Sequence, residues 1–190
     1  MKLEKVDQKN LELAYHIQKT IFPEEPDFLF IRRSVNSDRI EFNHYIAYVD
    51  DRPVGITGTY TEKCDKDSIW LSWFGVLPNE RQKGYGREIL LKTIEICKEL
   101  PFKYFRCYTS IVKSGSAQPL YRSVFDICEK YLNRDDETFN DTLLIYSMSL
   151  TDQTVPYWNN KYMGVKDYAV LSKEGEKYLA QQKTNKVIQV

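Results

Sequence analysis

Residues 76–87 read Val-Leu-Pro-Asn-Glu-Arg-Gln-Lys-Gly-Tyr-Gly-Arg, and this stretch decides the fold more than any other. The apolar run Ile69–Val76 comes directly before Leu77 and is typical of a central strand buried on both faces. Pro78 ends that strand, and an amphipathic helix is predicted to follow the glycines and to run to about Leu100. The pattern therefore predicts a buried strand, a glycine-containing turn and a helix in direct succession.

The turn has the features of an anion site. The first amides of a helix have no partner within the helix, and the helix dipole adds positive partial charge there. Gly84 and Gly86 let an anion approach the backbone closely, and Arg81, Lys83 and Arg87 add mobile positive charge. These residues alone predict a phosphorylated ligand. The P-loop string GxxxxGK[ST] is absent, and the GxGxxG fingerprint fails because its third glycine is Ile89.

The segment resembles motif A of the GNAT superfamily of N-acetyltransferases. That motif reads [R/Q]-x-x-G-x-[G/A] after a strand ending in V-x-P, and the matching residues here are Val76, Pro78, Arg81, Gly84 and Gly86. The order of predicted elements from residue 1 to about residue 150 also resembles the family fold.

A looser match lies downstream, at residues 117–125. The family's motif B often reads A-x-x-L-Y-x-x-x-G-F, and this chain shares its alanine, leucine, tyrosine and phenylalanine, the tyrosine being Tyr121. The motif's glycine is Val124 here, and the asparagine often found three residues before the alanine is Ser114. These departures weaken the expectation of cofactor contacts on this helix but leave Tyr121 in place.

The resemblance implies acetyl-CoA as co-substrate. The amides of residues 82–87 would hold its pyrophosphate, and the backbone of residues 74–76 would pair with the pantetheine arm, in a wedge between this strand and the next. Gly75 is a candidate for a close approach of the arm. The implied cofactor-binding residues are Phe74, Gly75, Val76, Arg81, Gln82, Lys83, Gly84, Tyr85, Gly86 and Arg87.

Direct acetyl transfer needs a neutral amine, stabilisation of the oxyanion and a proton for the leaving thiolate. A backbone N–H near Val76 could polarise the thioester, and the match to motif B implies Tyr121 as the proton donor. The general base stays open among Glu62, Asp65, Asp67, Asp141 and Tyr146. Cys107 is expected to be a core residue, since no base neighbour is evident.

The other elements follow from periodicity and turn residues. Helices are predicted over Asp7–Phe22, Phe28–Val35 and from Ser114 through Tyr121. Strands are predicted at His44–Val49, Val54–Tyr60, Tyr104–Thr109, Ile127–Leu132 and Thr142–Leu150, with a polar loop at Lys63–Asp67. The first two strands should form an antiparallel hairpin, and the alternation in the second predicts one buried face containing Val54, Ile56 and Tyr60. The fold class is α/β, with a central mixed, mostly antiparallel sheet flanked by helices as in acyl-CoA N-acyltransferases.

The predicted domain organisation is an acetyltransferase domain over residues 1–150 and an aromatic segment with a terminal helix (Ser172–Gln182) over residues 151–190, packed on that domain. The aromatic residues of this segment could instead line an acceptor pocket or form a homodimer interface. They are Tyr157, Trp158, Tyr162 and Tyr168.

Composition excludes several classes of function. The 27 basic residues balance 27 acidic ones, so the net charge of zero gives no electrostatic footprint for nucleic acid or an anionic membrane. The four cysteines show no CxxC spacing, so no metal site is expected. The chain shows no signal peptide and no apolar run near the ~20 residues that cross a bilayer, so a cytoplasmic location is expected.

Three functions compete. The leading one is an acetyl-CoA-dependent N-acetyltransferase acting on a primary amine, which could be a small amine, an amino acid, an aminoglycoside-like drug or a protein N-terminus. The alternative is a non-catalytic acyl-CoA-binding regulatory module, which would keep the motif A turn and have no use for Tyr121. The third is an interaction protein whose aromatic tail binds another chain.

Overall fold

The computed structural model describes residues 1–62, 65–110, 117–132, 142–158 and 169–170. The chain forms two compact units, called here the first unit (residues 1–61 and 68–102) and the second unit (residues 62–67 and 103–190). The predicted boundary at residue 150 stays a prediction. Within the described residues, no helix is both long and apolar enough to span a membrane.

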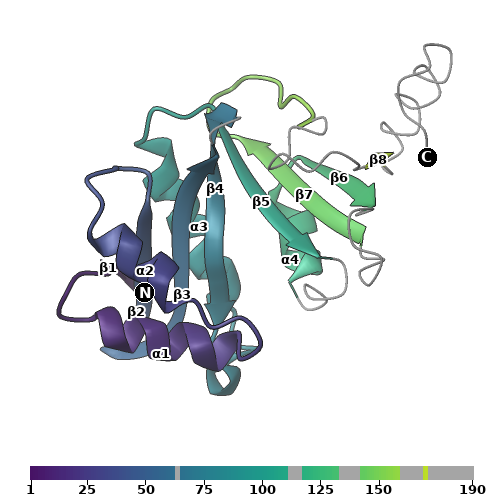
Figure 1. The fold of residues 1–190 in the computed structure, drawn as a ribbon. Helices are drawn as coiled ribbons and strands as arrows, with labels where there is room; N and C mark the ends of the chain where they lie inside the picture. Colours follow the sequence, from purple (N-terminus) through teal and green to yellow (C-terminus); the bar gives the residue numbers. More distant parts are fainter. Residues whose placement is uncertain (63–64, 111–116, 133–141, 159–168, 171–190) are drawn as a thin grey trace, which may run out of the picture. The chain divides into compact units, whose positions relative to one another are not determined.

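The first unit is built on strands that are hydrogen-bonded in the order β1-β2-β3-β4. They are β1 (Lys2–Lys5), β2 (Asn43–Val49), β3 (Arg52–Glu62) and β4 (Asp65–Val76), with a few residues at the β3–β4 turn assigned to the second unit. The pairs β1–β2 and β2–β3 are antiparallel. Helices α1 (Leu11–Ile21) and α2 (Phe28–Val35) lie on one face of these strands, and α3 (Tyr85–Lys98) lies on the other (Figure 1).

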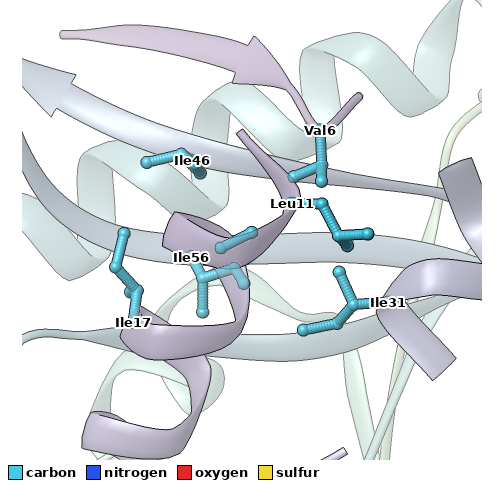
Figure 2. Packing of buried hydrophobic residues seen from close by; sticks show 7 residues of the cluster. Val6, Leu11, Ile17, Ile31, Ile46 and Ile56 are labelled. Atoms are coloured by element: carbon cyan, nitrogen blue, oxygen red, sulfur yellow. The ribbon is translucent and has the colours of Figure 1, made fainter. Parts of the chain in front are cut away.

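Each face of the first unit's strands has its own core. Figure 2 shows the first core, where side chains from α1, α2, β2 and β3 pack together. It contains Val6, Leu11, Ala14, Ile17, Ile31, Ile46 and Ile56. The second core contains Ala47, Val54 and Ile89 and packs α3 against the opposite face. Burial on both faces fixes the central strands between two helical layers.

The hairpin, α2 and the buried strand before Pro78 are confirmed, but the prediction that β3 has one buried face is wrong. A register shift between Ala47 and Tyr48 forms a β-bulge in the β2–β3 pair. As a result Val54 packs in the α3 core, whereas Ile56 packs in the α1–α2 core. A bulge adds a residue to one strand and so breaks the alternation on which the prediction rested.

Two further element predictions need correction, and one strand of the first unit was not predicted. Helix α1 begins at Leu11 rather than Asp7, because the Asp7 carboxylate accepts the N–H groups of Lys9 and Asn10 in a turn. Asp65–Asp67 belong to β4 rather than to a loop. Strand β1 was not predicted, because its charged composition masks a strand that pairs with β2.

The second unit contains β5 (Tyr104–Ser110), β6 (Ile127–Leu132), β7 (Thr142–Ser149) and β8 (Ala169–Val170), hydrogen-bonded in the order β5-β7-β6-β8. All three pairs are antiparallel. The short helix α4 (Gln118–Val124) packs on β7. Strand β8 was not predicted from the sequence. The predicted terminal helix Ser172–Gln182 lies outside the described residues.

Candidate functional site

The turn between β4 and α3 adopts a backbone conformation that requires a glycine. A short 3-10 helix, Pro78–Glu80, follows β4, and α3 then begins at Tyr85 with Gly84 as its N-cap. Gly84 has φ 82°, in the left-handed region that favours glycine. A Cβ at Gly84 would meet no atom within 4 Å, so the space in front of this residue is open. The position is therefore both strained for other residues and accessible to a ligand.

The turn presents a run of unpaired backbone donors. The amides of residues 82–86 have no hydrogen-bond partner among the described residues. The amide of Arg87 donates to the Gly84 carbonyl over 3.1 Å, so the run ends one residue before the predicted limit. Consecutive free N–H groups at a helix N-terminus are the arrangement that binds phosphate and pyrophosphate groups.

Two of the basic side chains brace the turn itself. Arg81 Nε donates to the Val76 carbonyl over 3.2 Å, and Lys83 Nζ lies 2.9 Å from a Glu80 carboxylate oxygen. The hydrogen bond from Lys83 is the main cause that lowers the pKa of Glu80. Arg52 also pairs with Glu80, at 3.4 Å. These contacts connect the turn to the start of β3 and the end of β4, and they leave the free amides as its main anion-binding groups.

The end of β4 is distorted where the pantetheine arm is expected. Trp73 has φ 35°, a left-handed value that is strained for a bulky residue. A Cβ at Gly75 would lie 2.6 Å from Ile21 Cγ2, so packing of α1 by itself requires glycine there. A Cβ at Gly55 would lie 2.4 Å from the Gly75 carbonyl oxygen. The sequence analysis missed Gly55, because its requirement comes from a neighbouring strand rather than from a local motif.

Tyr121 lies in the second unit, on α4, with only 5% of its surface exposed. Its ring centroid lies 5.3 Å from that of Tyr146 and 5.9 Å from that of Phe125. Its hydroxyl is hydrogen-bonded to the Cys107 thiol. Burial raises the pKa of Tyr121 well above 10, and Cys107 raises it further. Tyr121 is therefore protonated at neutral pH, as a proton donor must be.

Burial raises the pKa of the Cys107 thiol to about 12, so this cysteine is protonated at neutral pH. A thiol is a poor nucleophile, since the thiolate is the reactive form. With 3% of its surface exposed, Cys107 is a core residue.

Two of the acidic candidates for a general base form ion pairs. Asp65 pairs with Arg106 at 3.2 Å, and Asp67 pairs with Lys103 at 3.1 Å. Burial and the charge of Asp65 raise the pKa of Glu62. Burial raises the pKa of Tyr146 to about 12. Asp141 lies outside the described residues, and the choice of base stays open.

Sequence reasoning did not foresee a buried polar chain next to the end of β4. His44 is fully buried, with Nδ1 2.9 Å from Ser34 Oγ and Nε2 3.2 Å from Ser72 Oγ. Ser34 Oγ donates to the Ile31 carbonyl, so it accepts from His44, whose Nε2 then accepts from Ser72. Burial lowers the pKa of His44 to about 3. A lone histidine in a strand carries no signal that could have revealed this network.

Comparison with known proteins identifies the family. A profile of the acetyltransferase (GNAT) family matches residues 9–125, more than half of the chain. No curated protein matches.

Three solved structures illustrate the likeness in fold. An acetyltransferase of the GNAT family from Desulfovibrio desulfuricans has a TM-score of 0.67 at 18% identity, covering 79% of this chain and 99% of its own. One from Staphylococcus aureus has a TM-score of 0.58 at 20% identity, covering 79% and 99%. The ribosomal-protein-S18-alanine N-acetyltransferase from Escherichia coli has a TM-score of 0.61 at 13% identity, covering 85% and 99%.

These structures share the predicted fold class, in which helices flank a mixed sheet, so that prediction is confirmed. The family profile spans α1 to α4 and includes both the residue 82–86 turn and Tyr121. This chain therefore belongs to the GNAT family of acetyltransferases, enzymes that use acetyl-CoA.

Proposed function

We propose that this protein moves an acetyl group from acetyl-CoA to a primary amine by direct attack, without a covalent enzyme intermediate. The observation that carries the proposal is the run of unpaired amides at residues 82–86, next to the open space at Gly84. This arrangement suits the pyrophosphate of acetyl-CoA, because donors that need no reorganisation favour a bound anion.

The proposed reaction balances as follows. The neutral amine nitrogen attacks the thioester carbonyl carbon, and the carbon–sulfur bond then breaks. The amine nitrogen loses one proton to a base, and the CoA thiolate gains one from the Tyr121 hydroxyl. The raised pKa of Tyr121 keeps its hydroxyl protonated at neutral pH, so the proton is present when the thiolate leaves.

Replacing Tyr121 tests the assigned proton donor. We expect Tyr121→Phe to lower kcat by about 10²–10⁴-fold, the usual contribution of general acid catalysis, while the Kd for acetyl-CoA changes little. Steady-state kinetics with a panel of amines measures kcat, and calorimetry measures the Kd. Tyr104→Phe removes a hydroxyl from β5 of the same unit and is the matched control. An unchanged kcat in Tyr121→Phe contradicts the role.

The cofactor is tested first by thermal stability. A ligand that binds only the native state stabilises it, by about 2.7 kcal/mol at a hundred times its Kd. Acetyl-CoA and CoA should raise the Tm, and ATP should not. The absence of any shift with saturating acetyl-CoA would contradict the assignment of the turn. Binding without turnover of any amine would favour the alternative, a non-catalytic acyl-CoA-binding module.

The proposal also includes a cytoplasmic location and a homodimer. The panel of amines identifies the acceptor. The solved structures include a protein named as an alanine N-acetyltransferase of ribosomal protein S18, which is a reason to include peptide N-termini in the panel of amines. Gel filtration with light scattering measures the oligomeric state.

A further inference from the structure

A hollow lies on the first unit, beside α2 and residues 36–42. Its volume is about 510 Å³, and it is open to solvent. This volume falls within the range of about 300–1,000 Å³ that is usual for small-molecule sites. Leu29 and Phe42 supply an apolar part of the lining. The remaining lining side chains are all polar or charged.

Two of the three arginines that line the hollow have no acidic partner within the described residues. Arg32 and Arg33 line it from the last turn of α2, and neither guanidinium group forms a hydrogen bond or ion pair within the described part of the chain. Arg39 also lines it but is engaged, because its Nε lies 2.6 Å from a Glu41 carboxylate oxygen. The C-terminal dipole of α2 offsets only part of the repulsion between Arg32 and Arg33.

Most of the hydrogen-bonding capacity of the lining is donor capacity. The Arg32 and Arg33 guanidinium groups can only donate, and a carboxylate or phosphate can only accept. Asn36 Oδ1 accepts from Gln8 Nε2 over 2.8 Å, and Ser37 Oγ accepts from the Arg39 amide over 3.2 Å, so each of these oxygens already has one donor. The Asn36 amide nitrogen and the Ser37 hydroxyl add further donors. The two guanidinium groups therefore favour an anion.

The helix that carries the hollow is held in place from within. Asp27 caps its N-terminus by accepting from the Phe30 amide over 3.0 Å. Ile31 is fully buried, and Ser34 contacts His44. The Phe42 ring lies 4.9 Å from the Phe30 ring in an edge-to-face contact. The lining is therefore supported by ordered contacts on the buried side of α2.

The hollow is separate from the residue 82–86 turn. Arg39 is hydrogen-bonded to Thr61, near the end of β3, whereas Gly55 and Val54 contact Gly75 and Leu77 near its start. Residues 55 and 61 of one strand lie about 20 Å apart at 3.3 Å per residue. One small ligand does not span both places.

We propose that this hollow binds a small organic anion, in which a carboxylate or phosphate group is attached to an apolar group. The anion lies against Arg32, Arg33 and the Asn36 amide, and the apolar group lies against Leu29 and Phe42. The site does not depend on the acetyl-transfer reaction.

The test uses the full chain and two probes, 3-phenylpropionate and phenyl phosphate, with 3-phenylpropionamide as the neutral comparison. Amide chemical shifts in ¹H–¹⁵N spectra give both the Kd and the location of binding. We expect saturable shifts within residues 29–42 for at least one anion and none for the neutral amide. The anion with the lower Kd identifies the preferred group.

Variants distinguish binding at this site from binding at the residue 82–86 turn and from a general effect of lost positive charge. Arg32→Gln with Arg33→Gln, and separately Asn36→Asp, should each weaken the anion at least tenfold. Gly84→Glu should leave its Kd unchanged. The matched control is Lys19→Gln with Lys98→Gln, which removes one last-turn cation from each of α1 and α3. The proposal is overturned if no probe binds, if Gly84→Glu abolishes binding, or if the control weakens it equally.

Discussion

At the scale of single residues, the turn depends on one backbone angle. Gly84 has φ 82° and faces open space, so a substitution there meets strain from the backbone and not from neighbours. The free amides on both sides of Gly84 are suited to an anion, so any negative charge introduced there competes with the ligand.

Two substitutions at Gly84 separate strain from charge. Gly84→Ala should cost roughly 1–2 kcal/mol of stability, because an alanine in the left-handed region is strained. It should weaken CoA binding only modestly. Gly84→Glu adds a carboxylate at the free amides and should weaken CoA at least tenfold more than Gly84→Ala does. Calorimetry measures both affinities, and equal affinities for CoA would contradict the proposed pyrophosphate site.

His44 predicts a pH dependence of stability. Burial lowers its pKa from 6.5 to about 3, so the unfolded chain binds the proton at a higher pH than the folded chain does. The stability from neutral His44 is complete above pH 6.5 and is lost as the pH falls towards 3, by up to about 1.4 kcal/mol per pH unit. Urea unfolding between pH 4 and pH 7, a window set by that shift, measures the slope.

His44→Gln keeps a donor and an acceptor but cannot take up the proton, so the slope should fall in this variant. His16→Gln, at an exposed position of α1, is the control and should leave the slope as in the unmodified protein. The same slope in His44→Gln and in the unmodified protein would contradict the prediction.

At the scale of elements, the contact between β3 and β4 requires a glycine. A Cβ at Gly55 would lie 2.4 Å from the Gly75 carbonyl oxygen and 2.9 Å from Ile89 Cδ1. The nearer atom belongs to the backbone, which cannot turn away as a side chain does. The two strands therefore hold this separation only because residue 55 has no side chain.

Gly55→Ala should lower the free energy of unfolding by about 1–3 kcal/mol, as overpacking usually does. Ile89→Val removes the farther clash but not the nearer one, so adding it to Gly55→Ala should not restore stability. Urea unfolding measures both variants. Full rescue by Ile89→Val would show that the side-chain contact, not the backbone contact, sets the requirement.

At the scale of the whole molecule, the second unit depends on the buried charge of Arg106. Segments that are distant in the sequence surround this side chain. Arg106 is 2% exposed and pairs with Asp65 at 3.2 Å. Its Nη1 donates to Ser147 Oγ over 2.5 Å, and its Nη2 donates to the Pro156 carbonyl over 3.3 Å. One side chain thus connects the start of β4, β7 and the segment after β7.

Arg106→Gln should cost about 3–5 kcal/mol, because it leaves the Asp65 carboxylate buried without its cation. Asp65→Asn combined with Arg106→Gln should cost less than the sum of the single changes, since no charge is then left uncompensated. A double-mutant cycle from urea unfolding measures the coupling. If the costs of the two single changes simply add, the interaction between Asp65 and Arg106 contributes little to stability.

The sequence alone was sufficient for the features that depend on near neighbours in the chain. The strand before Pro78, the turn at Gly84, helix α2 and the hairpin after Asp50 follow from periodicity and turn residues, and the motif at residues 76–87 indicated the family. These are local effects, set by φ/ψ preferences and by the period of apolar residues.

Only the tertiary structure decided the features that depend on distant segments. These features are the bulge in the β2–β3 pair, the strand β1, the need for glycine at residue 55, and the buried partners of His44 and Arg106. All of them arise from contacts with other elements. The burial and desolvation of a residue are set by the segments that pack against it. The local sequence pattern around the residue therefore does not predict them.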